Sequence, residues 1–176
     1  MLPDLPADPE MRIVTARLEL IPLTEADADD LFPVLDDPEL GRFTGEDPPA
    51  DVEVLRTRFA SWSARRSPDG DELWLNWAVR RLEDGEAVGY VQATVGDRDA
   101  AIAWVVGTPF QRRGFATEAG AALVGWLRAA LEIPLITGCI HPDNIASQIA
   151  AGRIGLRPTD RWYDGEVVWT DEPDRG

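Results

Sequence analysis

Lysine is absent from this chain of 176 residues, and cysteine and histidine occur once each, as Cys139 and His141. A single cysteine excludes an intramolecular disulfide, and no basic-then-apolar leader pattern opens the chain, so we expect a cytoplasmic protein. No apolar run approaches the length of a membrane span, which predicts no membrane partner. We also expect no metal site.

Basic residues are outnumbered by acidic ones. The chain has 32 Asp and Glu against 17 basic residues, all of them arginine, and a formal net charge of −15. Because binding to nucleic acid requires a basic face, this balance argues against a nucleic-acid partner. An acidic surface attracts cationic molecules such as amines and basic peptides, although the same excess also serves solubility alone.

The length predicts one domain, which we place at residues 11–176 after a proline-rich, acidic and disordered tail over residues 1–10. Hydrophobic periodicity predicts an α/β (α+β) domain with a mixed sheet. The expected strands are 13–21, 73–81, 87–95, 101–106, 135–140 and 166–170, and the expected helices are 28–35, 52–62, 116–131 and 144–154.

The most informative segment is the loop Gln111–Ala119, which follows an apolar strand pattern and opens an amphipathic helix pattern. A helix N-terminus offers unpaired N–H groups and a favourable dipole to an anion, and Gly114 permits a close approach of the backbone. This order predicts a phosphate or pyrophosphate site, against the alternative of an ordinary turn with two solvated arginines. Neither the Walker motif nor the dinucleotide-binding glycine motif is present.

The segment QRRGFATEA resembles the acyl-CoA loop of the GNAT acetyltransferase superfamily, in particular its RimJ/RimL-like branch, which includes ribosomal-protein N-terminal acetyltransferases. Two further segments, 15–24 and 141–147, resemble the first strand and a later helix start of that branch. The resemblance implies the GNAT fold, a mixed and mostly antiparallel central sheet splayed between its fourth and fifth strands and flanked by helices. It also implies acetyl-CoA as co-substrate.

The same resemblance implies site residues. The loop would hold the pyrophosphate, the backbone of the fourth strand would meet the pantetheine arm and the thioester, and Ser147 would protonate the leaving thiolate. Asn144 would bind the pantetheine arm, serve as a helix N-cap, or do both. The implied cofactor-binding residues are Val105, Val106, Gln111, Arg112, Arg113, Gly114, Phe115, Ala116, Thr117 and Asn144.

The general base is left open by the sequence. His141 is a candidate because its pKa range suits proton transfer near neutral pH, although a histidine beside a proline is also a common turn residue. We interpret Glu118 as a structural residue of the first helical turn. Cys139 would permit a covalent acyl-cysteine route, but the resemblance implies direct attack by the amine.

The main hypothesis is therefore an acetyl-CoA-dependent N-acetyltransferase that acts on a primary amine, either a protein N-terminus or a small molecule, in a ternary complex. A catalytically inactive acyl-CoA-binding module and a generic phosphate-binding domain are the competing interpretations. The branch resemblance also allows a homodimer.

Overall fold

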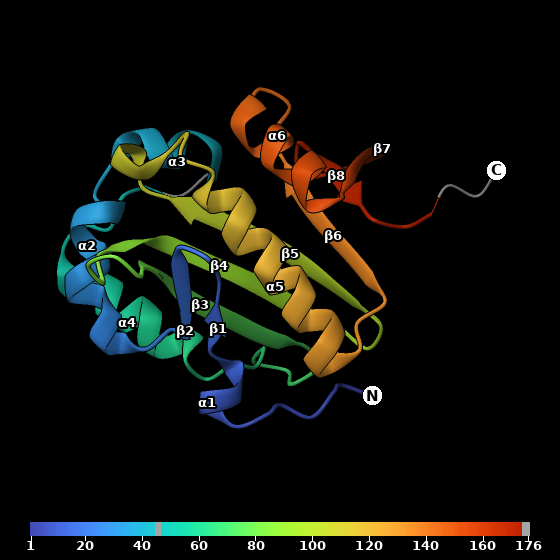
Figure 1. The fold of residues 1–176 in the computed structure, drawn as a ribbon, viewed down its shortest axis with the longest axis horizontal. Coiled ribbons are helices and arrows are strands. Elements are labelled where there is room, and N and C mark those ends of the chain that lie inside the picture. The colour runs from blue at the N-terminus through green and yellow to red at the C-terminus, as the bar shows by residue number, and fades with distance from the viewer. Residues whose placement is uncertain (45–46, 174–176) are drawn as a thin grey trace.

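The computed structural model describes residues 1–44 and 47–173 (Figure 1). Its helices are α1 (Asp8–Met11), α2 (Ala28–Leu35), α3 (Pro38–Thr44), α4 (Val52–Trp62), α5 (Phe115–Leu131) and α6 (Ile145–Ile154). Its strands are β1 (Ile13–Val14), β2 (Leu18–Pro22), β3 (Leu73–Arg81), β4 (Ala87–Val95), β5 (Asp99–Val106), β6 (Leu135–Ile140), β7 (Arg157–Tyr163) and β8 (Glu166–Thr170).

The strands of the described residues form one sheet in the order β1-β2-β3-β4-β5-β6-β8-β7. Every neighbouring pair is antiparallel except β5 and β6, which are parallel because α5 connects them. The predicted mixed, mostly antiparallel α/β sheet is confirmed. The single domain over 11–176 stays a prediction, and its residues 45–46 and 174–176 lie outside the described residues.

Helices cover both faces of the sheet, and α5 crosses one of them (Figure 1). Side chains alternate along β3, so that Trp77 is fully buried in the cluster below α5, while Ala78 faces the cluster below α2 and α4. Burying one large side chain completely contributes about 1.5–3 kcal/mol. The two clusters therefore fix the strands between them as a rigid support for the site.

The strand predicted over 13–21 is wrong in one respect, because it is two strands joined by a tight turn. Ile13 pairs with Leu20 across the turn. The Thr15 hydroxyl accepts a hydrogen bond from the Leu18 N–H at 2.9 Å, and the Thr15 backbone N–H donates to the Leu18 carbonyl at 2.9 Å. This local competition of a threonine side chain with the strand ladder reverses the chain. The short helix α3 was not predicted.

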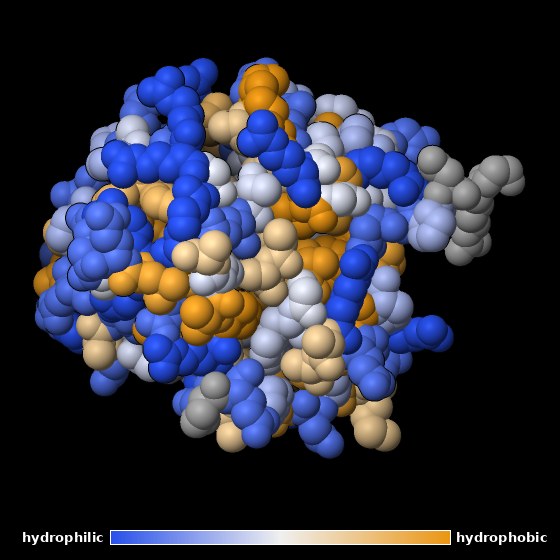
Figure 2. All heavy atoms as spheres, viewed as in Figure 1, coloured by the Kyte–Doolittle hydropathy of each residue, from blue (hydrophilic) through white to orange (hydrophobic). Residues whose placement is uncertain are grey.

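Residues 1–10, which the sequence predicts as a disordered tail, contact the domain in this structure. Leu2 and Leu5 pack against the cluster on the α5 face, and α1 begins at Asp8. The disorder of this segment stays a prediction. Among the residues that the structure describes, no helix combines the length and apolarity needed to cross a bilayer. Hydrophilic residues cover most of the face in Figure 2, with hydrophobic residues in patches between them.

Candidate active site

The sheet is divided between β5 and β6. These strands pair only at their first residues, from Asp99 opposite Leu135 to Ala101 opposite Thr137. Beyond Ala101 they diverge, while β6 continues to pair with β8 up to Ile140. This divergence is the predicted splay between the fourth and fifth strands, which are β5 and β6 here because the predicted first strand is divided into β1 and β2. It leaves backbone groups on this side of the β5 end without a strand partner.

The pairing of β5 with β4 shows which backbone groups face the gap. Gly107 donates its N–H to the Val88 carbonyl at 2.9 Å, and Val106 stands opposite Gly89. In an antiparallel ladder the hydrogen-bonding direction alternates, so the N–H groups of Trp104 and Val106 point toward β6. Val105 lines the cleft described below. Trp104 is thus a candidate that sequence reasoning missed.

The loop before α5 presents unpaired donors. Arg112 and Gly114 both adopt left-handed conformations, with φ of 60° and 82°. The amide of Glu118 donates to the Gly114 carbonyl at 3.0 Å, so the three amides from Phe115 to Thr117 precede the first hydrogen bond of α5. The side chains of Arg112 and Arg113 are exposed. These donors and charges fit a bound pyrophosphate.

The side chains of two loop residues face the protein and not the ligand. The Gln111 side chain donates to the Val106 carbonyl at 3.0 Å, which ties the loop to the end of β5. The Phe115 ring is buried in the core, so only its backbone is available to a ligand.

A cleft of about 210 Å³ lies at the gap. It brings together Val105, His141, Asn144 and Ser147, four of the residues predicted for the site, which come from β5, the end of β6 and the start of α6. The loop residues Gln111–Thr117 do not line this cleft. Its full lining is Phe43, Tyr90, Gln92, Ile102, Ala103, Trp104, Val105, Cys139, Ile140, His141, Asn144, Ser147 and Glu166.

Asn144 has the N-cap function predicted for it, whereas its binding of the pantetheine arm stays a prediction. Its Oδ1 accepts a hydrogen bond from the Ser147 N–H at 3.1 Å and so caps α6. Its Nδ2 has no partner among the described residues, and Asn144 lines the cleft. The Ser147 hydroxyl has no partner in the described part of the chain either, so both groups are available to a ligand.

His141 is held by its own turn. The Asp143 N–H donates to His141 Nδ1 at 3.1 Å, and the ring lies 5.7 Å from the Phe43 ring. A neutral imidazole that accepts at Nδ1 carries its hydrogen at Nε2. The ring then has no free lone pair for abstracting a proton, which weakens the prediction of His141 as general base.

Glu166 is the carboxylate that sequence reasoning missed. It begins β8 and lines the cleft beside His141 and Cys139. Burial raises its pKa above the usual value, and the nearby Asp164 charge adds to this, while His141 and its backbone N–H act in the opposite direction. A half-buried carboxylate with a raised pKa in a cleft is a candidate base. Only the pairing of β8 with β6 reveals its position.

A second hollow of about 280 Å³ adjoins the first and shares the wall formed by Gln92, Ile102, Ala103, Cys139 and Glu166. It extends toward Trp62 of α4 and Trp74 of β3. Gln92 donates to the Asn76 side-chain oxygen at 2.7 Å on its floor. The two tryptophans of β3 lie on different sides of the sheet, since Trp77 is buried in the core and Trp74 lines this hollow.

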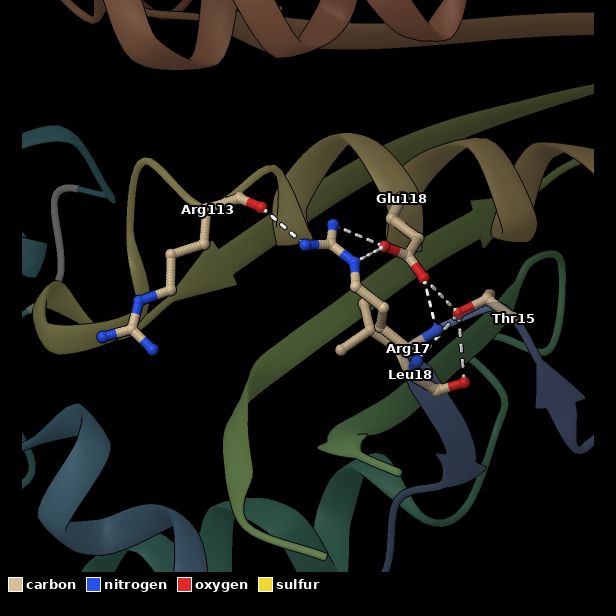
Figure 3. Close-up of polar contacts among 5 residues, drawn as sticks. All are labelled: Thr15, Arg17, Leu18, Arg113 and Glu118. Carbon is tan, nitrogen blue, oxygen red and sulfur yellow. Dashed lines mark hydrogen bonds and ion pairs between the residues drawn. The ribbon is translucent and has the colours of Figure 1, made fainter. Parts of the chain in front are cut away.

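The remaining chemistry-bearing residues are explained by their surroundings. Partial burial, followed by repulsion from Glu166, raises the pKa of the Cys139 thiol, which therefore stays protonated at neutral pH. Glu118 lines neither hollow and is hydrogen-bonded to Thr15 and Arg17, which agrees with its structural interpretation (Figure 3). Within residues 1–44 and 47–173, no group of three or more His, Cys, Asp and Glu is arranged to hold a metal ion.

A sheet opened at one end, with a helix N-terminus and a polar cleft beside the opening, is the architecture of an acyltransferase. The model of the acetyltransferase (GNAT) domain matches residues 17–157, so the chain belongs to the GNAT acetyltransferase family. It is accordingly an acetyl-CoA-dependent N-acetyltransferase. No curated relative matches its sequence.

Solved structures share the fold at low sequence identity. A GNAT acetyltransferase from Bacillus anthracis is 17% identical, covers 91% of this chain and 97% of its own, and superposes with a TM-score of 0.75. RimJ of Mycobacterium smegmatis, solved with CoA-disulfide, is 21% identical over 87% and 80% of the two chains, with a TM-score of 0.72. A GCN5-related N-acetyltransferase from Brucella melitensis is 22% identical over 97% and 81%, with a TM-score of 0.70. These likenesses show a shared fold, and the assignment to the RimJ/RimL-like branch stays a prediction.

Proposed function

We propose that this chain acetylates a primary amine, on a protein N-terminus or a small molecule, by direct attack of the amine on the donor thioester within a ternary complex. The observation that carries the proposal is the meeting of Asn144, Ser147 and Glu166 in one cleft at the open end of β5. The cleft thus joins a carboxylate, a hydroxyl and an amide donor at the gap in the sheet.

The donor substrate supplies an acetyl group activated as a thioester. The free amides from Phe115 to Thr117 bind its pyrophosphate, and the exposed Arg112 and Arg113 add positive charge. The Asn144 amide donates to the pantetheine arm. The Val106 and Trp104 N–H groups face the gap, where they stabilise negative charge that develops on the thioester oxygen.

The acceptor enters as an ammonium ion, which must lose a proton before its nitrogen can attack. Glu166 takes this proton, and its raised pKa makes it a better base than an ordinary glutamate. The nitrogen lone pair then forms the new N–C bond as the C–S bond breaks. Of the two protons that the ammonium group loses, one leaves through Glu166, and the other reaches the thiolate sulfur by way of the Ser147 hydroxyl.

The second hollow suits the body of the acceptor. It shares Glu166 and Gln92 with the first hollow, so a molecule whose amine lies at Glu166 extends between Trp62 and Trp74. Indole walls favour an apolar or aromatic group next to the amine, and they also stabilise a cation. The net charge of −15 favours cationic acceptors over acidic ones at longer range.

The competing interpretations have less support. An inactive binding module has no use for a serine hydroxyl and a carboxylate with a raised pKa in one cleft. A generic phosphate-binding domain has no use for the gap between β5 and β6. A homodimer and a cytoplasmic location stay predictions.

The test is release of free CoA thiol from acetyl-CoA in the presence of amines. The panel contains peptides with apolar, aromatic and acidic N-terminal residues, polyamines and aminoglycosides, and each reaction is matched by one without amine. We expect release with an amine that carries an apolar or aromatic group next to its nitrogen. Tight acetyl-CoA binding without release for any amine would favour the inactive module instead.

A further inference from the structure

A polar network joins the β1–β2 turn to the first turn of α5 (Figure 3). Arg17 of the turn donates to the Glu118 carboxylate from Nε at 2.7 Å and from a terminal nitrogen at 2.6 Å. The other Glu118 oxygen accepts from the Arg17 backbone N–H at 2.9 Å and from the Thr15 hydroxyl at 2.6 Å. Both oxygens of Glu118 are thereby bound to the β1–β2 turn.

The position of Glu118 makes this network relevant to anion binding. Glu118 directly follows the three free amides of α5, from Phe115 to Thr117. Partial burial alone would raise its pKa, but the hydrogen bonds from Thr15 and Arg17 outweigh this effect, and its pKa lies below the usual value. A fixed negative charge therefore stands beside the amides that would bind a pyrophosphate, and it would repel that group if it were not compensated.

The same guanidinium also supports the loop itself. Arg17 donates to the Arg113 carbonyl at 3.0 Å, and the guanidinium carbon of Arg17 lies 4.9 Å from the centre of the Phe115 ring. Between these contacts stands Gly114, where an added Cβ would lie 3.4 Å from an Arg17 nitrogen. One side chain from a distant part of the sequence thus contacts the loop before, at and after the glycine that opens α5.

We propose that Arg17 is a positioning residue for the donor substrate, which it serves by neutralising Glu118 beside the pyrophosphate site and by holding the loop around Gly114. The proposal rests on the proposed function, because it requires the pyrophosphate to bind at this loop. Arg17 lies outside both hollows, so it acts on donor affinity and not on the amine or the chemical step.

A simple brace between the β1–β2 turn and α5 is the competing role, since an ion pair with a half-exposed arginine often contributes little beyond local order. The two roles differ in their dependence on phosphate. A positioning role for the pyrophosphate weakens the binding of CoA much more than that of pantetheine, which has no pyrophosphate. A brace affects both molecules alike or neither.

The experiment measures CoA binding by titration calorimetry, together with kinetics for acetyl-CoA and S-acetylpantetheine. The variants are Arg17→Met, Arg17→Lys and Arg17→Met with Glu118→Gln. Arg12→Met is the matched control, because it removes another Arg–Glu ion pair of the same hairpin, with Glu19, without touching the loop. The melting temperature of each variant shows whether it is folded.

We expect Arg17→Met to weaken CoA binding roughly tenfold or more, the effect of losing charge-assisted hydrogen bonds. KM for acetyl-CoA should rise while kcat and the kinetics with S-acetylpantetheine stay within about twofold. Arg17→Lys should restore part of the affinity, since it keeps the charge. Adding Glu118→Gln to Arg17→Met should also restore part of it, because the uncompensated carboxylate is then gone.

Unchanged CoA binding in Arg17→Met would overturn the inference and leave the proposed function intact. An equal loss for acetyl-CoA and S-acetylpantetheine would assign Arg17 to the brace. If Arg17→Met does not fold, the double variant decides: CoA binding within a few-fold of the wild type supports the charge role, and binding tenfold weaker or worse contradicts it. Failure of the wild-type protein itself to bind CoA would instead refute the proposed function.

Discussion

The Asp143 N–H donates to Nδ1 of His141 at 3.1 Å, and this bond occupies the lone pair that a general base would need. We therefore expect His141→Asn to keep kcat/KM within about threefold, because an asparagine oxygen also accepts from the Asp143 N–H. Steady-state kinetics with the best amine of the panel measure the effect. A loss of a hundredfold or more, the size expected for a missing base, would return His141 to the catalytic role.

Cys139 lines the cleft, yet its raised pKa keeps the thiol protonated and weakly nucleophilic at neutral pH. We expect Cys139→Ser to retain kcat within a few-fold of the wild type. Mass spectrometry of wild-type protein incubated with acetyl-CoA alone should show no acetylated Cys139. An acetylated cysteine that disappears when amine is added would establish the covalent route and contradict direct attack.

Asn144 has a cap function and a donor function that two substitutions separate. Asn144→Asp keeps an oxygen that accepts from the Ser147 N–H but lacks the Nδ2 donor, whereas Asn144→Ala lacks both. We expect Asn144→Asp to keep the unfolding free energy and to weaken acetyl-CoA binding several-fold. Asn144→Ala should lose about 1 kcal/mol of stability as well.

Denaturant unfolding of the two Asn144 variants measures the unfolding free energy, and CoA titration measures the binding affinity. Wild-type CoA affinity in Asn144→Asp would show that the side chain serves only as a cap.

Two glycines of the α5 region should respond oppositely to alanine. Gly125 lies within α5, and an added Cβ would have no atom within 4 Å. Because alanine has a higher helix propensity than glycine, Gly125→Ala should stabilise the protein by about 0.5–1 kcal/mol. Gly114 has a φ of 82°, which disfavours any residue with a Cβ, and an added Cβ would lie 3.4 Å from an Arg17 nitrogen. Gly114→Ala should therefore cost about 1–2 kcal/mol and weaken CoA binding. Denaturant unfolding checks both; destabilisation by Gly125→Ala would contradict the packing described.

The sequence predicted the helices and strands whose periodicity is strong, and local motifs predicted the loop before α5 and the cap at Asn144. It missed what depends on contacts between distant segments. Glu166 has an ordinary local context, and only the pairing of β8 with β6 brings it to the cleft. The partnership of Arg17 with Glu118 spans 101 residues. The β1–β2 turn was missed because the Thr15 side chain competes with an otherwise continuous strand pattern.

We propose that Glu166 takes the proton of the acceptor amine at the gap between β5 and β6. Its folded-state pKa is raised, so activity should fall as the pH drops through a value above that of an ordinary glutamate, where the carboxylate becomes protonated. The raised pKa also means that ionised Glu166 costs stability as the pH rises, so Glu166→Gln should gain in melting temperature relative to wild type toward neutral pH.

The most direct measurement is therefore the pH profile of kcat/KM for wild type and Glu166→Gln. Asp160→Asn serves as control, because Asp160 is an exposed β7 carboxylate outside both hollows. We predict that Glu166→Gln lowers kcat/KM by about 10²–10⁴ and abolishes the acidic limb, while Asp160→Asn changes neither. A Glu166→Gln variant that keeps wild-type kcat/KM and the same acidic limb would exclude Glu166 as the general base.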